Sequence, residues 1–276
     1  MITGAAGFIG QQVARNAASA GFGPVWATLH RSRPPAVDGV SCYQLDVANE
    51  SAVNNLLRQL RPDVVIHAAY RKDGPGAEVI TVAGSGNVAR AAAEIGARLV
   101  HISSDMVLDG ENAPYDESAH PAPVHEYGRA KAAAEALVAA SAPAAAIVRT
   151  SLVCRIDPPD PATKWVTDSL RTGQPITLFT DEIRCPIWLD DLCAALLELA
   201  AGDFSGVINV SGPQALNRYE IGLRLAEHLG LDARSLTPGL SSQSRVRRPR
   251  NLTLDTSLAR RLLRTTLRSF DEGLAA

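Results

Sequence analysis

The sequence has no excess of charge of either sign and few cysteines. Its 276 residues carry 27 basic and 29 acidic side chains, so no overall field exists to hold nucleic acid or an anionic membrane. The four cysteines form no Cys-x-x-Cys pair, which argues against a zinc site and a disulfide scaffold, and the six histidines share no metal-ligand spacing. We expect no metal and a reducing, cytoplasmic environment.

Long apolar runs are also absent. No uninterrupted apolar stretch approaches the roughly 20 residues that a membrane helix needs, and no basic segment followed by an apolar run and a cleavage site opens the chain. We therefore expect neither a membrane span nor a secretory signal. With 46% hydrophobic residues, the chain is long and apolar enough for a sizeable core, which excludes a disordered chain.

Short apolar runs alternate with longer helical patterns over the first 150 residues. This alternation is typical of βαβ units, so we predict an α/β fold of the Rossmann type, a doubly wound parallel sheet with a smaller C-terminal lobe. The expected strands are 25–29, 41–45, 64–67, 99–103 and 145–149, and the expected helices are 8–20, 51–60, 77–95 and 126–141.

The alternation weakens at the proline-rich segment 157–161, which marks the entry to a second region. We predict a first unit over 1–150 and a second over 151–276, with about 185–210 returning to the core. The second unit is expected to contain strands 176–179 and 207–210 and helices 190–201, 218–229 and 256–270.

Gly4, Gly7 and Gly10 stand at the first expected strand-to-helix turn, and Phe8 and Ile9 open the helix. Glycines at such a turn let the backbone approach a pyrophosphate, whose charge the helix N-terminus stabilises. The alternative is that these glycines only allow a tight turn and close packing of the helix, which would produce the same pattern. The position at the first βα junction favours a bound dinucleotide, with these five residues as ligands.

The end of the second expected strand indicates which dinucleotide binds. An acidic residue would hold the ribose 2′-hydroxyl of NAD there, whereas this chain has His30, Arg31 and Arg33. Two guanidinium groups suit a 2′-phosphate, so we predict NADP (NADPH) in preference to NAD; a solvated basic loop is the alternative. Asp46 and Val47 close the third strand and are expected to meet the adenine, although a helix-capping Asp would look the same.

Tyr127 and Lys131 lie four residues apart and therefore share one face of the expected helix 126–141. A phenol transfers protons poorly near neutrality, and a fixed positive charge beside it lowers its pKa. Lys131 is one of only three lysines, which makes a chance Tyr-x-x-x-Lys match rare. Ser104 follows the expected strand 99–103, at the strand end where doubly wound sheets bind ligands.

The glycine loop, the strand-end serine and Tyr-x-x-x-Lys occur in the order found in the extended short-chain dehydrogenase/reductase family, which the whole chain resembles. Segments 99–110, 114–115, 127–131, 186–192 and 248–255 are similar to those of its dTDP-4-dehydrorhamnose reductase-like, sugar-nucleotide-binding subgroup. The resemblance implies an oxidoreductase that uses NADPH to reduce a keto group, most simply on a nucleotide-activated deoxysugar. It also implies a cofactor-binding first unit and a substrate-binding second one.

The resemblance assigns roles to individual residues. Tyr127 would protonate the keto oxygen while NADPH delivers hydride to the carbon, Lys131 would bind the nicotinamide ribose and lower the Tyr127 pKa, and Ser104 would hydrogen bond the carbonyl. Asp105 would lie at the substrate and assist proton supply.

Three further residues receive binding roles from the same resemblance. Ala68 and Ala69 would contact the cofactor, and Arg248, in an Arg-rich loop, would clamp the substrate pyrophosphate unless that loop is simply solvated. A homodimer through the helices that flank the sheet is common among similar proteins, and no nucleic-acid or membrane partner is expected.

The chain departs from the family at three places. Thr81 stands where an Asn commonly organises the proton path, and the segment 71–76 is shorter than its counterpart. Only Met1 and Ile2 precede Thr3, where the family has a full first strand. A misassigned start codon would produce such a short first strand. The first two departures favour a second hypothesis. The chain would then be a catalytically idle NADP-binding regulatory subunit, similar to the beta subunit of methionine adenosyltransferase.

Overall fold

The computed structural model describes residues 1–31, 36–72, 74 and 76–276. A seven-stranded sheet in the order β11-β6-β5-β4-β1-β2-β3 forms the larger lobe, and every neighbouring pair in it is parallel. This architecture confirms the predicted Rossmann-type α/β fold. The strands are β1 (Ile2–Thr3), β2 (Val25–Leu29), β3 (Val40–Gln44), β4 (Val64–His67), β5 (Arg98–Ile102), β6 (Ala146–Thr150) and β11 (Gly206–Val210).

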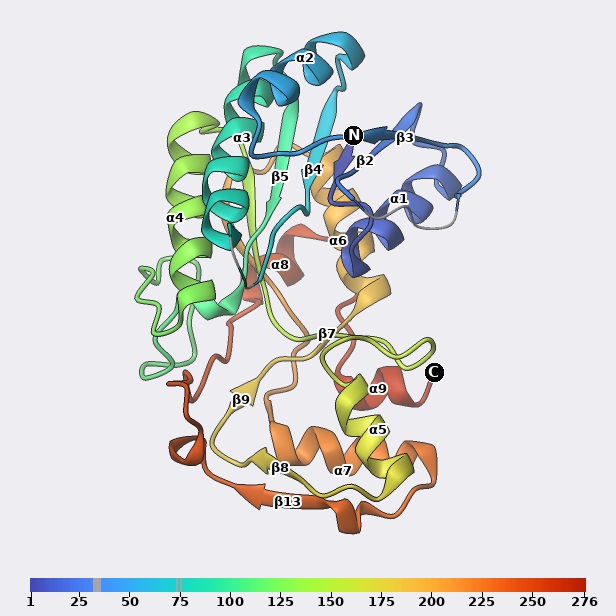
Figure 1. The fold of residues 1–276 in the computed structure, drawn as a ribbon, viewed down its shortest axis with the longest axis vertical. Helices are drawn as coiled ribbons and strands as arrows, with labels where there is room; N and C mark the ends of the chain where they lie inside the picture. Colours follow the sequence, from blue (N-terminus) through green and yellow to red (C-terminus); the bar gives the residue numbers. More distant parts are fainter. Residues whose placement is uncertain (32–35, 73, 75) are drawn as a thin grey trace.

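Helices cover both faces of this sheet (Figure 1). One face is packed by α1 (Phe8–Ser19) and α6 (Leu189–Ala201), and the other by α2 (Glu50–Leu60), α3 (Gly84–Glu94) and α4 (Glu126–Ser141). Because strands buried on both faces need apolar side chains on both sides, near-continuous runs such as Val64–His67 form the centre of the sheet. The predicted helix 77–95 begins as the π-helix η1 (Val79–Ala83) and continues as α3.

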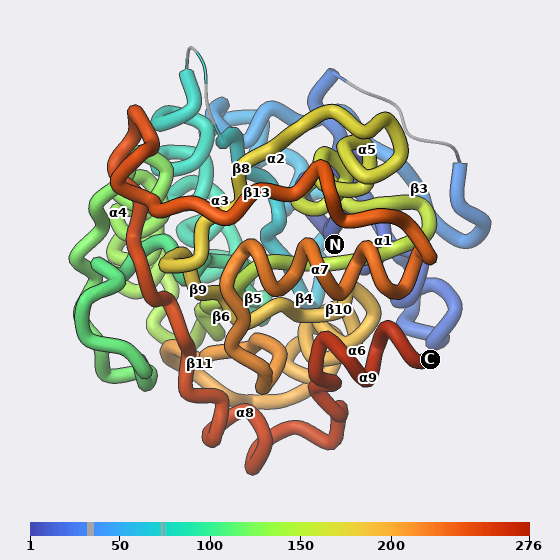
Figure 2. Tube along the Cα trace, turned by 90° about the horizontal axis from the view of Figure 1, so that it is seen from below, coloured from blue at the N-terminus to red at the C-terminus, as the bar shows by residue number. Residues whose placement is uncertain are grey.

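The smaller lobe lies beyond the carboxyl ends of the strands, where α5, α7 and a short strand pair stand in front of the sheet when viewed from below (Figure 2). Its apolar core includes Trp188 stacked on Phe270 at 5.5 Å between ring centroids. Its elements are β7 (Val153–Cys154), α5 (Lys164–Thr172), β8 (Ile176–Phe179), β9 (Ile183–Arg184), β10 (Ile187–Trp188), β12 (Leu216–Asn217), α7 (Arg218–Leu229), β13 (Leu236–Gly239) and α9 (Phe270–Leu274). Helix α8 (Ser257–Leu262) returns to the larger lobe, where it packs against β11.

The predicted helix 256–270 was wrong over its second half. Only α8 is helical there, because Leu263 adopts an extended backbone (φ −96°, ψ 144°) and the chain then follows the surface of α6. The backbone N–H groups of Arg264 and Thr265 donate to Glu198, while Leu263 and Leu267 enter the core shared by α1 and α6. Tertiary hydrogen bonds and burial thus replaced the helix that the local periodicity favoured.

Buried polar contacts tie the first strand to its neighbours. The Thr3 hydroxyl lies 2.7 Å from His67 Nδ1, His67 Nε2 lies 3.1 Å from the Ser85 hydroxyl, and Ser85 donates to the Thr81 carbonyl. Burial, followed by the nearby charge of Lys131, lowers the pKa of His67 to about 3, so this imidazole is neutral. The two-residue strand β1 is therefore anchored by side chains as well as by its ladder.

Candidate active site

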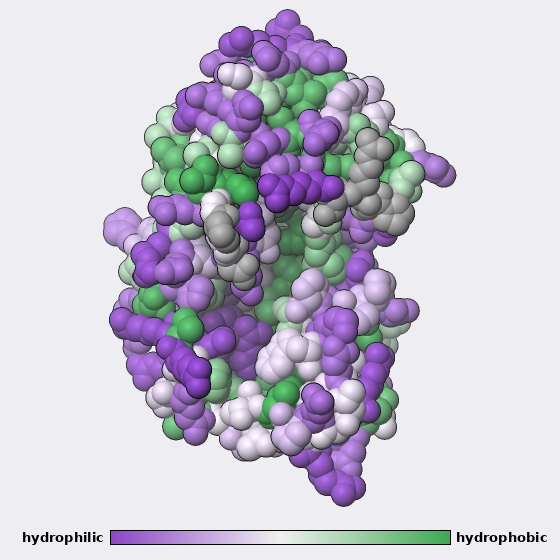
Figure 3. Space-filling model, viewed as in Figure 1, coloured by the Kyte–Doolittle hydropathy of each residue, from purple (hydrophilic) through white to green (hydrophobic). Residues whose placement is uncertain are grey.

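A cavity of about 390 Å³ lies at the carboxyl end of β1, β2 and β4, over the glycine loop. Gly4 has φ +68°, and a Cβ there would stand 2.6 Å from the backbone of Ala69, so only glycine fits this turn. The predicted cofactor residues that line the cavity are Gly4, Gly7, His30, Arg31, Asp46, Val47, Ala68 and Ala69. The same face of the molecule is hollowed between the two lobes, with apolar residues deep in the hollow (Figure 3).

Other predicted cofactor residues lie away from this cavity. A Cβ on Gly10 would stand 2.5 Å from the Gly4 carbonyl oxygen, so Gly10 serves the packing of α1 against the loop. Ile9 packs on the core under the sheet, and the Phe8 ring is covered by the Arg155 guanidinium at 4.8 Å. Arg33 lies outside the described residues.

Three predicted residues, Ser104, Tyr127 and Lys131, come together where the end of β5 meets the first turns of α4. His125 caps α4 by accepting from the Tyr127 N–H at 3.1 Å, which places Tyr127 and Lys131 one turn apart on the face toward the sheet. Lys131 Nζ donates to the carbonyl of Ile102, the last residue of β5, at 2.8 Å. Ser104 lies two residues further along, and its hydroxyl is near enough to the Tyr127 phenol to lower the pKa of that phenol.

A close approach of backbones makes this assembly possible. Gly128 packs against the turn 105–107, and a Cβ at this position would stand 2.0 Å from the Met106 carbonyl oxygen. The residue between Tyr127 and Arg129 therefore has to be glycine for α4 to come near Ser104.

Burial dominates the electrostatics of Tyr127 and Lys131. Burial, with added contributions from Tyr70 and Asp105, holds the pKa of Tyr127 well above its usual value, although the bond from Ser104 lowers it. The pKa of this phenol is therefore raised overall and not lowered as expected, because burial outweighs the opposing contributions. Burial also lowers the pKa of Lys131 to about 8, against the raising effect of Glu135. Tyr127 is thus protonated at neutral pH, the state that a proton donor requires.

Tyr70, at the end of β4, is a site residue that sequence reasoning missed. Its ring centroid lies 5.8 Å from that of Tyr127 and 4.9 Å from Lys131 Nζ, a cation–π distance. Its place directly after Ala68 and Ala69, at a strand end, was the signal that could have identified it.

A buried ion pair stands behind the three residues. Glu135, one turn after Lys131, accepts three hydrogen bonds from Arg149 at 2.9, 3.1 and 3.3 Å and a fourth from the Ser103 hydroxyl at 2.5 Å. Both charged side chains are less than a tenth exposed. An arginine inside the apolar strand run 145–149 was the sequence signal for this pair.

The second lobe contributes a charged cluster. Glu182 is buried and contacts Arg218 at 2.8 Å, Arg248 at 3.2 Å and Arg184 at 3.3 Å. Burial pushes the pKa of Glu182 upward, but the arginines hold it below its usual value. The predicted substrate residue Arg248 is thus held by Glu182, and its guanidinium stands over the Phe179 ring at 5.5 Å.

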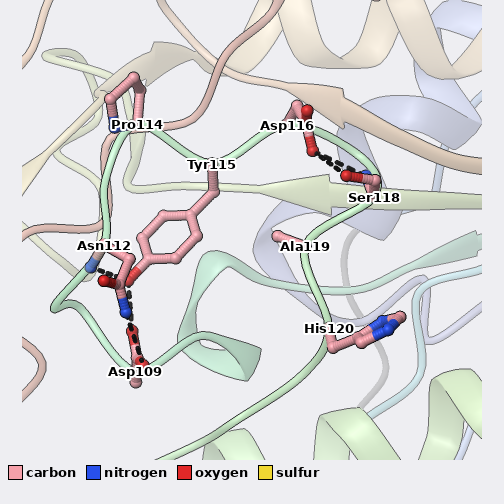
Figure 4. Close-up of a pocket in the computed structure, with 8 residues that line it drawn as sticks. All are labelled: Asp109, Asn112, Pro114, Tyr115, Asp116, Ser118, Ala119 and His120. Atoms are coloured by element: carbon pink, nitrogen blue, oxygen red, sulfur yellow. Dashed lines mark hydrogen bonds between the residues drawn. The ribbon is translucent and has the colours of Figure 1, made fainter.

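Another pocket, of about 360 Å³, lies on the loop before α4 and contains no predicted site residue. Figure 4 shows its polar groups bonded to one another: the Tyr115 hydroxyl donates to Asp109, and Asp116 accepts from Ser118. Within the described ranges, no group of three or more His, Cys, Asp or Glu side chains is placed to hold a metal, and no helix is long and apolar enough to cross a membrane.

Comparisons with known proteins agree with this geometry. The family model described as RmlD substrate binding domain matches residues 1–276. The dTDP-4-dehydrorhamnose reductase of Mycobacterium tuberculosis is 30% identical over 256 residues, which cover 88% of this chain and 79% of that protein. Methionine adenosyltransferase 2 subunit beta of Rattus norvegicus is 28% identical over 275 residues, covering 93% and 80%. The resemblance derived from the motifs is confirmed.

Solved structures give the same fold. The dTDP-4-dehydrorhamnose reductase of Bacillus anthracis in complex with NADP superposes with a TM-score of 0.83 at 25% identity, covering 99% of this chain and 96% of that one. MoeE5 in complex with UDP-glucuronic acid and NAD has a TM-score of 0.84 at 24% identity, covering 99% and 95%. Relatives of this fold therefore include proteins in complex with NADP and with NAD.

Proposed function

The chain belongs to the RmlD substrate binding domain family and is an NAD(P)-dependent oxidoreductase of the short-chain dehydrogenase/reductase type, and from this premise we propose that it uses NADPH to reduce a keto group on a nucleotide-activated deoxysugar. One observation carries the proposal. Ser104, Tyr127 and Lys131 converge at the carboxyl edge of the sheet, next to the glycine-loop cavity.

The residues at this edge divide the chemistry among them. When bound, the dinucleotide supplies the hydride. Tyr127 donates its proton to the keto oxygen, and Ser104 orients that oxygen by hydrogen bonding. Lys131, fixed by the Ile102 carbonyl, offers its remaining N–H bonds to the ribose hydroxyls of the cofactor.

The architecture supports separate cofactor-binding and substrate-binding parts of the chain. We propose that 1–150 binds the cofactor and that 151–276 mainly binds the substrate, with about 185–210 returning to the core. Helix α6 packs on α1, and β11 pairs with β6 at the edge of the sheet. Arg248 and Asp105 face the proposed substrate from the two lobes. A homodimer and a cytoplasmic location remain predictions.

The expected NADPH preference rests on Arg31, a lining residue of the cofactor cavity. A guanidinium there forms charge-assisted bonds to a 2′-phosphate, which NADH lacks. We expect Arg31→Ala to weaken NADPH binding about tenfold or more and to leave NADH binding within about twofold, because a bond to a charged group contributes about 1.5–3 kcal/mol. Fluorescence titration with both dinucleotides, with Arg15→Ala on α1 as the control, measures this. Equal weakening of both would contradict the preference.

The direct test of the function is NADPH oxidation over a panel of nucleotide-linked 4-keto sugars. We expect turnover with at least one of them, and the panel identifies the sugar and nucleotide. The similarity to methionine adenosyltransferase 2 subunit beta makes an idle NADP-binding regulatory subunit the second candidate. NADPH binding without turnover on this panel or on other ketones, together with a stably co-purifying enzyme, would favour that second function.

A further inference from the structure

Arg155 is a cation of the second unit that contacts the larger lobe. It directly follows β7, which lies where the two lobes meet (Figure 1). Its guanidinium carbon stands 4.8 Å from the ring centroid of Phe8, the first residue of α1. Phe8 comes directly after Gly7, a lining residue of the cofactor cavity. The second unit therefore places a positive charge beside the helix that follows the glycine loop.

Hydrogen bonds fix the base of the Arg155 side chain and leave its end available. The Arg155 N–H donates to the buried Asp160 carboxylate at 3.0 Å, and the Arg155 carbonyl accepts from the Asp160 N–H at 3.0 Å. The Nε–H donates to the Pro158 carbonyl at 3.0 Å. Among the residues that the structure describes, no carboxylate pairs with this guanidinium, and its terminal amino groups have no acceptor. These amino groups can therefore donate to a ligand.

The start of α1 has no negative charge of its own. The unpaired N–H groups of a helix N-terminus carry a partial positive charge. The first turn of α1 contains no acidic residue, and no side chain caps the helix at Gly7. Helix α6 differs, because Asp190 and Asp191 stand in its first turn. A guanidinium beside the positive end of α1 is favourable only when an anion lies close to both.

The pyrophosphate of a dinucleotide is the anion that fits this place. The glycine loop, where Gly4 leaves no room for a Cβ, lets the backbone approach such a group, and the loop lines a cavity of about 390 Å³. A guanidinium is planar and can donate to two phosphate oxygens at once.

We propose that Arg155 is a ligand of the cofactor pyrophosphate, which it binds together with the N-terminus of α1. This inference rests on the proposed function, because it adds a residue to the same cofactor site. It also gives the second unit a part in cofactor binding. The pyrophosphate is common to NADPH and NADH, so Arg155 strengthens the binding of both, whereas the effect expected of Arg31 is confined to NADPH.

Calorimetric titration with three ligands tests the role of Arg155. NADPH and NADH contain the pyrophosphate, whereas adenosine 2′-monophosphate has the 2′-phosphate and no pyrophosphate. We expect Arg155→Met, which keeps an apolar cover on Phe8, to weaken both dinucleotides about tenfold or more and to leave the monophosphate within about twofold. Arg155→Lys keeps the charge and loses the planar donor, so its affinities should be intermediate. Arg171→Met removes the same charge from an exposed position on α5 and should bind all three ligands like the wild type.

Two results would overturn the inference. Unchanged affinity of Arg155→Met for both dinucleotides would mean that the guanidinium only covers Phe8. Equal weakening of all three ligands would mean that the substitution damages the whole cofactor site. Because the titrations measure binding, they decide the role of Arg155 even if the panel of 4-keto sugars gives no turnover. A wild-type protein that binds neither dinucleotide would contradict the proposed function, and this inference with it.

Discussion

Replacing Tyr127 by phenylalanine is expected to lower kcat by about 10²- to 10⁴-fold while NADPH binds with nearly unchanged affinity. The ring and its packing are kept, and only the proton donor is lost, which is the range that general acids contribute. Because burial keeps the pKa of Tyr127 above its usual value, the phenol is fully protonated at neutral pH in the wild-type protein. We therefore expect a loss of similar size throughout the neutral pH range.

Steady-state rates and fluorescence titration of NADPH measure the two parts of this prediction. Tyr43→Phe, on the edge strand β3 and away from the proposed reaction centre, is the matched control and should retain wild-type turnover. If Tyr127→Phe keeps more than about a tenth of the wild-type kcat, another group donates the proton. A parallel loss of NADPH affinity would indicate a binding role in place of proton donation.

Replacing Glu135 by alanine is expected to lower the free energy of unfolding by about 3–5 kcal/mol. The substitution leaves the Arg149 guanidinium buried without a counter-charge, and it removes the acceptor of the Ser103 hydroxyl. It also removes the charge that raises the pKa of Lys131, so this pKa should fall below about 8 and part of the lysine charge would be lost at neutral pH. Stability and turnover should therefore both decrease.

Urea denaturation of the single variant and of Glu135→Leu combined with Arg149→Met measures the first effect. Replacing a whole buried ion pair by apolar residues of similar volume is often neutral, so the double variant should recover most of the lost stability. A loss below about 1 kcal/mol for Glu135→Ala would mean that Arg149 finds another partner or water. The turnover rate of the double variant then measures the effect of the changed Lys131 pKa alone, because this variant has no unpaired charge in its core.

The element order of the larger lobe was predictable because its segments are locally consistent. Runs such as Val64–His67 and helices such as Glu126–Ser141 agree with the expected boundaries to the residue. Parallel strands buried on both faces leave continuous apolar runs, and α4 carries its own cap in His125. The small lobe was less predictable, since its two-residue strands and the extended segment after Leu263 depend on partners distant in sequence.

By itself, the sequence determined the glycine turn, the arginine at the end of the second strand, and the placement of Tyr127 and Lys131 on one helix face, because each depends on residues within one turn or one junction. Only the tertiary structure decided the charges. It placed the Lys131 ammonium over the Tyr70 ring, paired Glu135 with Arg149, surrounded Glu182 with three arginines and linked Asp105 to Ser104. These contacts join strands and helices far apart in the chain, and burial at their meeting point sets which groups hold their protons.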